Sequence, residues 1–488
     1  MRSARWEASV VALAGWAAVA VVALALAAAA AFALLTLRRP LDGVEAEILF
    51  EAQRIRAGLP LYVDPLVGAF EYGEPPSRYY VLYPPIWSAA VAIFPSPPVA
   101  RIVSLAAWWG ALFWAAARSP RERRLPALAI AAFVASFQTL MQFGSTMRPD
   151  ALAVGLAGLA LARAIERGRL DAISAMLFAL AAWTKPNVLG LGAGVLVASL
   201  ARDGRATARA LVAPFALSAA IAATLHVASH GQWVEHLRRS TLQAWSLDQW
   251  RAFFPSRIPF LGSLVGAAAA VAWMRRDLPS ARLGGAALLT SFAWMTVCMG
   301  KTGSQNNYWL EPTMGAAVVL ARVPFPRLEG RAALLAAALA CAQACYTDVG
   351  SIRGSLEETE QARAWTAVLR EARALVGARP DEIVVGSPGV EMDLDGRVVE
   401  TPFQMGNLAK RGLFPVDPWI AQMTHPRVAG LITGDVLGEP GEPPLPASKT
   451  RHFEFPEAVR ARLQQEFVLV AVPNRDQRIY ARRRRVTP

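Results

Sequence analysis

Between Val10 and Tyr346 the sequence is a succession of apolar runs of about 15 to 25 residues, separated by short polar breaks. Runs of this length match the thickness of a lipid bilayer, where only helices and closed barrels satisfy every backbone polar group. The chain is 54% hydrophobic and 18% charged, whereas soluble proteins average roughly 45 to 50% apolar and about 25% charged. We therefore predict a polytopic α-helical membrane protein, and the composition argues against a water-soluble enzyme. The predicted spans, about 11 in number, lie near 10–37, 98–117, 125–145, 150–165, 171–184, 187–201, 210–228, 258–274, 283–300, 310–322 and 332–347.

The last part of the chain has a different composition, with ordinary charge density, frequent Pro and Gly, and no apolar run long enough to cross a bilayer. Its patterning predicts helices near 355–376 and 456–466, and strands near 382–386, 428–433, 467–472 and 478–483. We therefore divide the chain into a transmembrane module, residues 1–347, and a small α/β soluble domain, residues 348–488.

The formal net charge of +13 comes largely from arginines in the short loops between apolar runs. Positively charged loops stay on the cytoplasmic side of a membrane. Segment 83–94 is apolar but short, and an interfacial position for it makes every later arginine-rich loop cytoplasmic. This topology predicts a protein of a bacterial-type inner membrane with a cytoplasmic N-terminus. The first outer loop (38–97), a second outer loop (229–257) and the C-terminal domain are then extracytoplasmic. Because topology explains the charge, we expect no nucleic-acid partner.

Three carboxylates, Asp42, Glu45 and Glu47, begin the first outer loop. Apolar residues at helical spacing follow, so Asp42 to Ala57 is predicted to be an amphipathic helix on the membrane surface. Asp42 and Glu45 have the spacing of a capping box, which requires no chemistry. Alternatively, clustered carboxylates beside a membrane could supply a general base or hold a divalent cation. The candidate cation ligands are Asp42, Glu45 and Asp150.

Polar turns interrupt the apolar runs at three points on the predicted outer face. A Lys-Pro break is costly in lipid unless it lines a polar cavity, so Lys185 is a candidate to bind an anion. Simpler interpretations are a helix cap at Asp150, a snorkelling Arg148 and an interfacial belt over 301–309. The candidate substrate- or phosphate-binding residues of these turns are Arg148, Lys185, Asn187, Lys301, Asn307 and Tyr308, and Asp150 is a fourth candidate catalytic carboxylate.

Other chemistries find little support in the sequence. No P-loop, Rossmann glycine fingerprint, GxSxG or HExxH motif occurs, which argues against nucleotide-driven and hydrolase functions. The three cysteines lie in apolar runs and lack the spacing of a disulfide framework or a zinc site. The EMDLD stretch (Glu391, Asp393 and Asp395) is spaced like ligands for a hard cation, but alternation in a turn or strand explains it equally well.

Several short motifs follow one another on the predicted outer face. They are Asp42/Glu45/Glu47, the A-x-R-x-x-x-G-x-x-L-Y run over 52–62, Pro84-Pro85, Arg148-Pro149-Asp150, Thr184-Lys185-Pro186-Asn187 and Asn307-Tyr308-Trp309. In their order and placement the chain resembles the GT-C superfamily of membrane glycosyltransferases. The resemblance is greatest to the family 39 protein mannosyltransferases and the lipid A aminoarabinose transferases, and it covers residues 1 to about 325.

The resemblance implies that a carboxylate of the first outer loop acts in catalysis and that nearby basic residues bind the phosphate of a lipid carrier. Many relatives read Asp-Glu-Gly where this chain has Asp42-Gly43 and then Glu45, so both carboxylates remain candidates. The implied reaction transfers a sugar, with inversion, from a polyprenyl-phosphate carrier to a hydroxyl of a lipid, glycan or protein acceptor. The alternatives are a transporter or flippase of a lipid-linked or anionic substrate, and a lipid-linked oligosaccharide polymerase or ligase.

Overall fold

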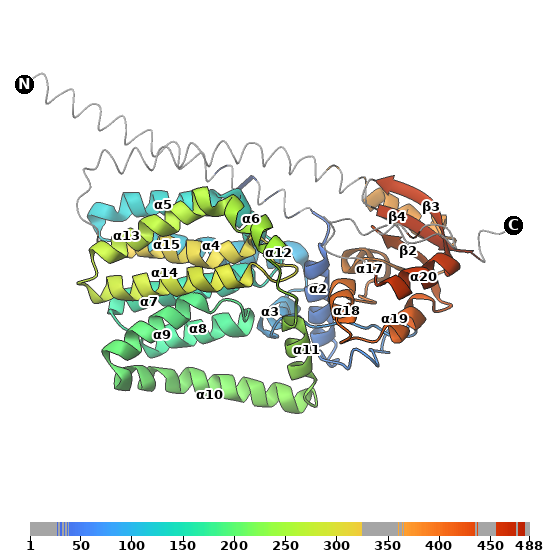
Figure 1. Ribbon diagram of the computed structural model, residues 1–488, viewed down its shortest axis with the longest axis horizontal. Coiled ribbons are helices and arrows are strands. Elements are labelled where there is room, and N and C mark those ends of the chain that lie inside the picture. The colour runs from blue at the N-terminus through green and yellow to red at the C-terminus, as the bar shows by residue number, and fades with distance from the viewer. Residues whose placement is uncertain are drawn as a thin grey trace, which may run out of the picture.

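The computed structural model describes residues 39–324, 366–434, 455–474 and 477–483, with isolated residues between 27 and 37 and at 360, 364 and 437. Figure 1 shows long helices running side by side, an α/β domain at one end of them, and α2, α3 and α11 between the two parts. The predicted spans at 10–37 and 332–347, and most of the predicted helix at 355–376, lie outside the described residues. The count of about 11 spans therefore stays a prediction.

The helical bundle follows the predicted spans closely. Its helices are α4 (Pro97–Ala117), α5 (Arg124–Ser136), α6 (Gln138–Gly144), α7 (Asp150–Arg167), α8 (Ala172–Thr184), α9 (Gly190–Arg202), α10 (Gly204–Ala228), α13 (Ser263–Met274), α14 (Pro279–Cys298) and α15 (Leu310–Arg322). The predicted span at 125–145 is divided into α5 and α6 at Phe137, which has extended backbone angles. Among the described helices, α4, α10 and α14 are long and apolar enough to cross a membrane.

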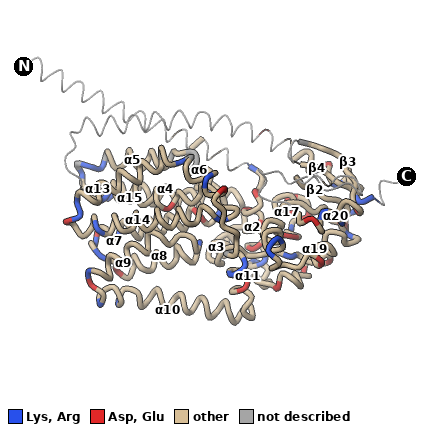
Figure 2. The backbone as a smooth tube through the Cα atoms, in the orientation of Figure 1, with Lys and Arg blue, Asp and Glu red and all other residues tan. Residues whose placement is uncertain are grey.

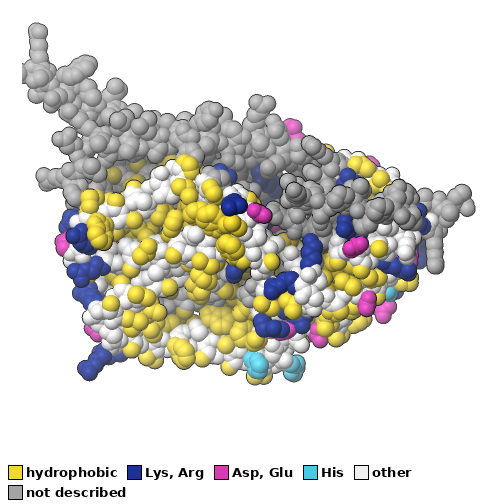
Figure 3. Space-filling view, in the orientation of Figure 1, with side chains coloured by type: hydrophobic (Ala, Val, Ile, Leu, Met, Phe, Trp, Pro, Cys, Tyr) yellow, Lys and Arg dark blue, Asp and Glu magenta, His cyan; other side chains and the backbone are white. Residues whose placement is uncertain are grey.

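The surface of the bundle agrees with a membrane location. Figure 3 shows hydrophobic side chains spread over the bundle face, and Phe215 and Val212 of α10 are 76% and 66% exposed. In Figure 2, basic residues gather at the end of the bundle that is remote from the α/β domain. The loops at that end are the arginine-rich loops that the sequence assigns to the cytoplasm. The assignment follows from the rule that positively charged loops stay on the cytoplasmic side.

Helices α9 and α14 pack through small residues. A Cβ atom on Gly190 would lie 2.3 Å from the Cα of Ser291, and one on Gly194 would lie 2.3 Å from the carbonyl oxygen of Ala286. Without a hydrophobic driving force in lipid, helices associate through such close backbone contact. The glycines of α9 therefore set the distance between the two helices.

An outer layer covers one end of the bundle. It contains α2 (Gly43–Arg56), α3 (Ile86–Ile93), α11 (Gln232–Thr241) and α12 (Leu247–Phe253). Helix α3 has only eight residues, which agrees with a segment too short to span. Helix α2 matches the predicted bounds, but the polar face expected of an amphipathic helix is enclosed by protein. Both of its sides are covered, by α3 and by α17 (Pro388–Asp395), and Glu45, Glu47, Glu51 and Arg54 are buried.

The C-terminal domain contains the predicted strands as β1 (Ile383–Val385), β2 (Val428–Thr433), β3 (Phe467–Asn474) and β4 (Gln477–Arg482). They form a sheet in the order β1-β2-β4-β3, in which only the β1–β2 pair is parallel. Helices α18 (Pro402–Ala409), α19 (Val416–Met423) and α20 (Glu457–Glu466) pack with it. The EMDLD stretch forms the end of α17, so its expected turn or strand is wrong. Glu391 accepts hydrogen bonds from the backbone of Gly386, Val399 and Glu400.

The first outer loop enters the C-terminal domain. Arg78 pairs with Glu400 in a β-bridge, and its backbone NH donates to the carbonyl oxygen of Val399 at 2.8 Å. The backbone NH of Tyr80 donates to Thr401 Oγ1 at 3.1 Å, and the Tyr80 ring belongs to the same hydrophobic cluster as Trp419. The domain is therefore built partly from residues of the first outer loop.

The packing of α9 on α14 yields a stability prediction. Gly194→Ala should destabilise the protein by about 1 to 3 kcal/mol, because the added methyl group overlaps backbone that cannot move freely. The matched control is Gly266→Ala in α13, where a Cβ meets no atom within 4 Å. The melting temperature in detergent, followed by size-exclusion chromatography after heating, measures both. Equal melting temperatures for the two variants would contradict the assigned α9–α14 contact.

Candidate functional site

A cavity of about 230 Å³ lies where the bundle, α11 and α18 meet. It is lined by Val44, Leu82, Tyr83, Arg148, Lys185, Pro186, Asn187, Leu237, Ser240, Gln243, Lys301, Gly303, Gln305, Asn307, Tyr308, Phe403 and Gln404. All six residues that the sequence proposes for substrate or phosphate binding are in this lining. The three polar turns therefore converge, as expected for breaks that face a polar cavity.

Lys185 forms an ion pair with Asp150 on one wall of this cavity. The Asp150 carboxylate also accepts a hydrogen bond from Asn307 Nδ2 at 2.7 Å. The Lys185 ammonium lies 5.7 Å from the Tyr83 ring centre and 5.8 Å from that of Tyr308, within cation–π range. Asn187 Nδ2 donates to the Tyr308 hydroxyl at 2.9 Å. Three side chains thus contact the lysine, two asparagines orient two of those three, and the charge of Lys185 is already balanced by Asp150.

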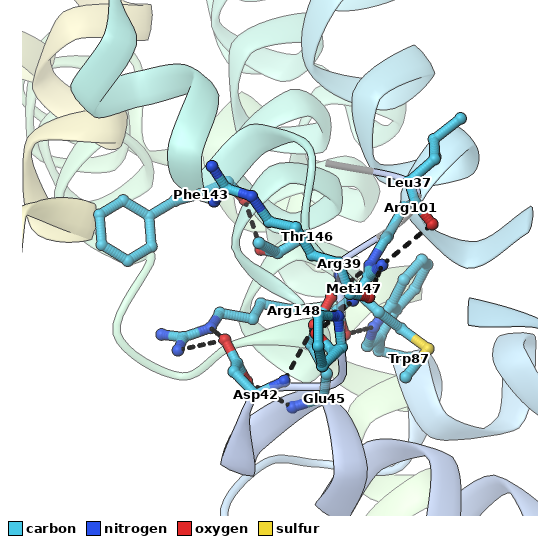
Figure 4. A network of polar contacts seen from close by, with 11 residues as sticks. Leu37, Arg39, Asp42, Glu45, Trp87, Arg101, Phe143, Thr146, Met147 and Arg148 are labelled. Carbon is cyan, nitrogen blue, oxygen red and sulfur yellow. Dashed lines mark hydrogen bonds and ion pairs between the residues drawn. The ribbon is translucent and has the colours of Figure 1, made fainter. Parts of the chain in front are cut away.

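Asp42 and Arg148 form a second ion pair. The Asp42 carboxylate accepts from the guanidinium of Arg148 at 2.7 and 3.1 Å. Asp42 is also the N-cap of α2, where it accepts from the backbone NH of Glu45 at 2.8 Å, so the predicted capping box is confirmed. Its side chain is 38% exposed. In Figure 4 the Arg148 guanidinium lies directly beside the Asp42 carboxylate. Asp42 therefore combines a structural role with exposure to solvent, and it pairs with a lining residue without lining the cavity itself.

Glu45 lies in a different environment, although it is only one helical turn away. Its carboxylate binds the guanidinium of Arg101 at 2.6 and 2.8 Å and accepts from the backbone NH of Met147 at 2.6 Å. Both charged side chains are at most 3% exposed. Arg101 also donates to the carbonyl oxygens of Leu37, Arg39 and Pro40 (Figure 4). Every contact of Glu45 joins parts of the chain, which separates its role from that of Asp42.

Glu47 is buried near the cavity and carries a shifted pKa. Burial raises its pKa well above the ordinary value, and the nearby Glu51 and Asp42 carboxylates add to the rise. A hydrogen bond from Gln404 of the C-terminal domain opposes the shift. Glu51, one turn further along α2, binds the Ser88 hydroxyl, and burial raises its pKa to about 8. Glu47 and Glu51 therefore keep their protons to a higher pH than carboxyl groups in water do.

The structure does not bring Asp42, Glu45 and Asp150 together as ligands of one cation. Each of the three binds a different basic side chain, Arg148, Arg101 and Lys185 respectively. Within the ranges that the structure describes, no group of three or more His, Cys, Asp or Glu side chains is arranged to hold a metal ion.

Sequence reasoning missed three kinds of site residue. Arg101 is a charged residue inside a predicted apolar span. Charged residues are rare in such spans, so its position in the sequence could have marked it as a candidate. Tyr83 lies next to the Pro84-Pro85 motif and lines the cavity. Phe403 and Gln404 come from the C-terminal domain, and nothing in their local sequence distinguishes them from other residues of an amphipathic helix.

Comparison with solved structures identifies the fold. ArnT from Cupriavidus metallidurans in its apo state has a TM-score of 0.57 at 15% identity, over 96% of this chain and 98% of ArnT. ArnT from Cupriavidus metallidurans bound to undecaprenyl phosphate has a TM-score of 0.56 at 13% identity, over 95% of this chain and 97% of ArnT. Neither a comparison with protein-family models nor a search of curated proteins finds a match. The two ArnT comparisons cover both parts of the chain, which therefore has the same fold as ArnT.

The contrast between Asp42 and Glu45 yields a second prediction. Glu45→Gln should destabilise the protein by about 3 to 5 kcal/mol, because it leaves the buried Arg101 charge without its counter-ion. Asp42→Asn should change stability by less than about 1 kcal/mol, because Asn is also a good N-cap and the side chain is partly exposed. Melting temperatures in the same detergent measure both variants. An Asp42→Asn variant less stable than Glu45→Gln would reverse the assignment.

Proposed function

We propose that the protein transfers a sugar from a polyprenyl-phosphate carrier to an acceptor hydroxyl on the outer face of a bacterial-type inner membrane. The observation that carries this proposal is the charge balance of the cavity. Arg148 and Lys185 are each paired with a carboxylate. Lys301 also lines the cavity, and in the described part of the chain no carboxylate lies within ion-pairing distance of it.

The surplus of one positive charge fits the donor chemistry. A sugar joined to a polyprenyl phosphate is a phosphodiester and carries a single negative charge. Arg148, Lys185 and Lys301 supply three positive charges, and two of them are paired with carboxylates, so one positive charge is left to match the phosphodiester. A cation in a cavity next to lipid is costly unless it binds an anion, so Lys301 is the expected phosphate ligand. The same fold in ArnT bound to undecaprenyl phosphate supports a carrier of this class.

The size and position of the cavity agree with one sugar-phosphate group. Its volume of about 230 Å³ corresponds to roughly eight water molecules at about 30 Å³ each. The carrier chain would remain in lipid, because the cavity lies at the end of the bundle next to α11. The charged residues of the cavity come from the turns at this one end, whereas a transporter needs a polar path through the membrane depth. The position of these charges thus favours transfer over transport.

In the proposed reaction Asp42 is the general base. It takes the proton from the acceptor hydroxyl, whose oxygen attacks the anomeric carbon of the sugar. The bond between that carbon and the phosphate oxygen breaks, and the phosphate leaves with the electron pair. Lys301 and Arg148 stabilise the charge that grows on the departing phosphate. A single displacement of this kind inverts the configuration at the anomeric carbon. Glu45 serves as an anchor, and Asp150 positions Lys185 and Asn307.

Carrier binding depends on Lys301 in this proposal. Lys301→Met should raise the Kd for undecaprenyl phosphate at least about 10-fold, because a charge-assisted hydrogen bond to the phosphate is lost. The matched control is Lys410→Met, which changes an exposed lysine after α18. Native mass spectrometry of the purified protein titrated with the lipid measures both Kd values. Undecaprenol, which has no phosphate, should bind both variants equally. An unchanged Kd for the phosphate in Lys301→Met would contradict the assigned anion site.

Catalysis depends on Asp42. Asp42→Asn should lower the transfer rate by at least about 100-fold while it preserves the helix cap and carrier binding. The test compares cells that lack the protein and are complemented with wild-type or variant chain, with lipid and glycan products quantified by mass spectrometry. Immunoblots of the membranes control for the amount of protein. Wild-type product levels from Asp42→Asn would exclude Asp42 as the base.

A further inference from the structure

The C-terminal domain supplies part of the cavity wall. Phe403 and Gln404, near the start of α18, line the cavity together with residues of the bundle. The contact between the domain and the Lys301 turn is tight, since a Cβ atom on Gly303 would lie 2.3 Å from the Phe403 ring. Gly303 also has a φ of +82°, a conformation that favours glycine. The domain is thus placed against the cavity by a contact that admits no larger residue.

Two side-chain amides of the cavity are oriented by carboxylates. Asn307 donates through Nδ2 to Asp150 at 2.7 Å, and Gln404 forms a side-chain hydrogen bond to Glu47 in which its Oε1 takes no part. These bonds fix which end of each amide carries the oxygen. They leave Asn307 Oδ1 and Gln404 Oε1 as the free ends of the two groups.

Both oxygens are buried acceptors without a hydrogen-bond partner in the described structure. Gln404 as a whole is only 6% exposed. A buried acceptor without a donor is costly, and such groups in native proteins call for an explanation. The two acceptors belong to opposite parts of the molecule, one to the bundle and one to the C-terminal domain, and both residues face the same small cavity.

We propose that Gln404 Oε1 and Asn307 Oδ1 form a pair of acceptors that recognises hydroxyl or amino groups on the sugar of the carrier lipid. This inference rests on the proposed function and assigns the C-terminal domain a part in choosing the sugar. Lys301 binds the phosphate, and the acceptor pair binds hydrogen-bond donors on the group attached to it. Gln404 is then a specificity-determining residue, because a site built to accept hydrogen bonds rejects ligands without donors.

The test measures the preference of the protein for a sugar-bearing carrier. Full-length protein in nanodiscs is titrated by native mass spectrometry with undecaprenyl phosphate and with undecaprenyl phosphate that bears mannose, glucose or arabinose. The preference is the Kd of the sugar-free lipid divided by that of the best sugar-bearing lipid. A fourth probe carries a tetrahydropyranyl ring, which has the bulk of a sugar ring and no hydroxyl groups.

Gln404→Met keeps the length of the side chain and removes the acceptor. It should reduce the preference roughly 2- to 12-fold, the effect of one hydrogen bond, and leave the Kd of undecaprenyl phosphate unchanged. Gln404→Asn keeps the amide but shortens the side chain by one methylene group, which moves the acceptor away from the sugar. It should also reduce the preference, and it replaces Gln404→Met in the test if that variant fails to fold. The matched control is Gln465→Met, which changes an exposed glutamine of α20 in the same domain. The tetrahydropyranyl probe should bind wild type and Gln404→Met equally.

The outcomes separate this inference from the function on which it rests. Loss of preference in the Gln404 variants, with undecaprenyl phosphate still bound, supports the acceptor pair. A wild-type protein that binds undecaprenyl phosphate but prefers none of the three sugars overturns the pair, and so does full preference in a correctly folded Gln404→Met or Gln404→Asn. A wild-type protein that binds undecaprenyl phosphate no better than undecaprenol overturns the proposed function itself.

Discussion

The requirement that charges beside a bilayer be paired governs the arrangement of this molecule. A charge removed from water is costly, and attraction to an opposite charge with good hydrogen bonds offsets much of that cost. Glu45 and Arg101 meet the requirement completely, because the pair is buried and its remaining bonds go to the backbone. The Asp42–Arg148 pair meets it only in part, since Asp42 stays partly exposed. The difference separates a buried ion pair from a partly exposed one along one turn of helix, and it is the reason why Asp42 rather than Glu45 is the proposed base.

Helix α2 transmits this pairing to the rest of the structure. Through Glu45 it holds the start of α4 and the loop before α7, and through Glu51 it holds α3. Its other side packs on α17, so the bundle and the C-terminal domain share one element. Because helix α2 is buried, its carboxylates bind side chains or backbone of α4, the loop before α7, α3 and α18. Each carboxylate therefore has a different environment.

The sequence predicted the helical bundle, the four strands and six of the residues that line the cavity, because each leaves a strong local pattern. Polar turns stand out against apolar runs, and alternation marks the strands. Pairing across the fold leaves no such mark. The choice between Asp42 and Glu45 depended on Arg101, which is 56 residues from Glu45 in the sequence. The role of Gln404 depended on how a separate domain packs, and no spacing rule relates it to Asn307.

The bundle and the C-terminal domain meet at the cavity and contribute residues to each other. Tyr80 of the first outer loop lies in the core of the C-terminal domain, and Phe403 of that domain lies against the Lys301 turn. A ligand that binds Lys301 and Gln404 together therefore contacts both sides of one interface. Its binding energy adds to the contacts at Tyr80 and Phe403, because a ligand stabilises the arrangement that it binds. A carrier without the sugar gains only the phosphate contact. In the proposed site, binding of the sugar would therefore stabilise the contact between the domain and the bundle.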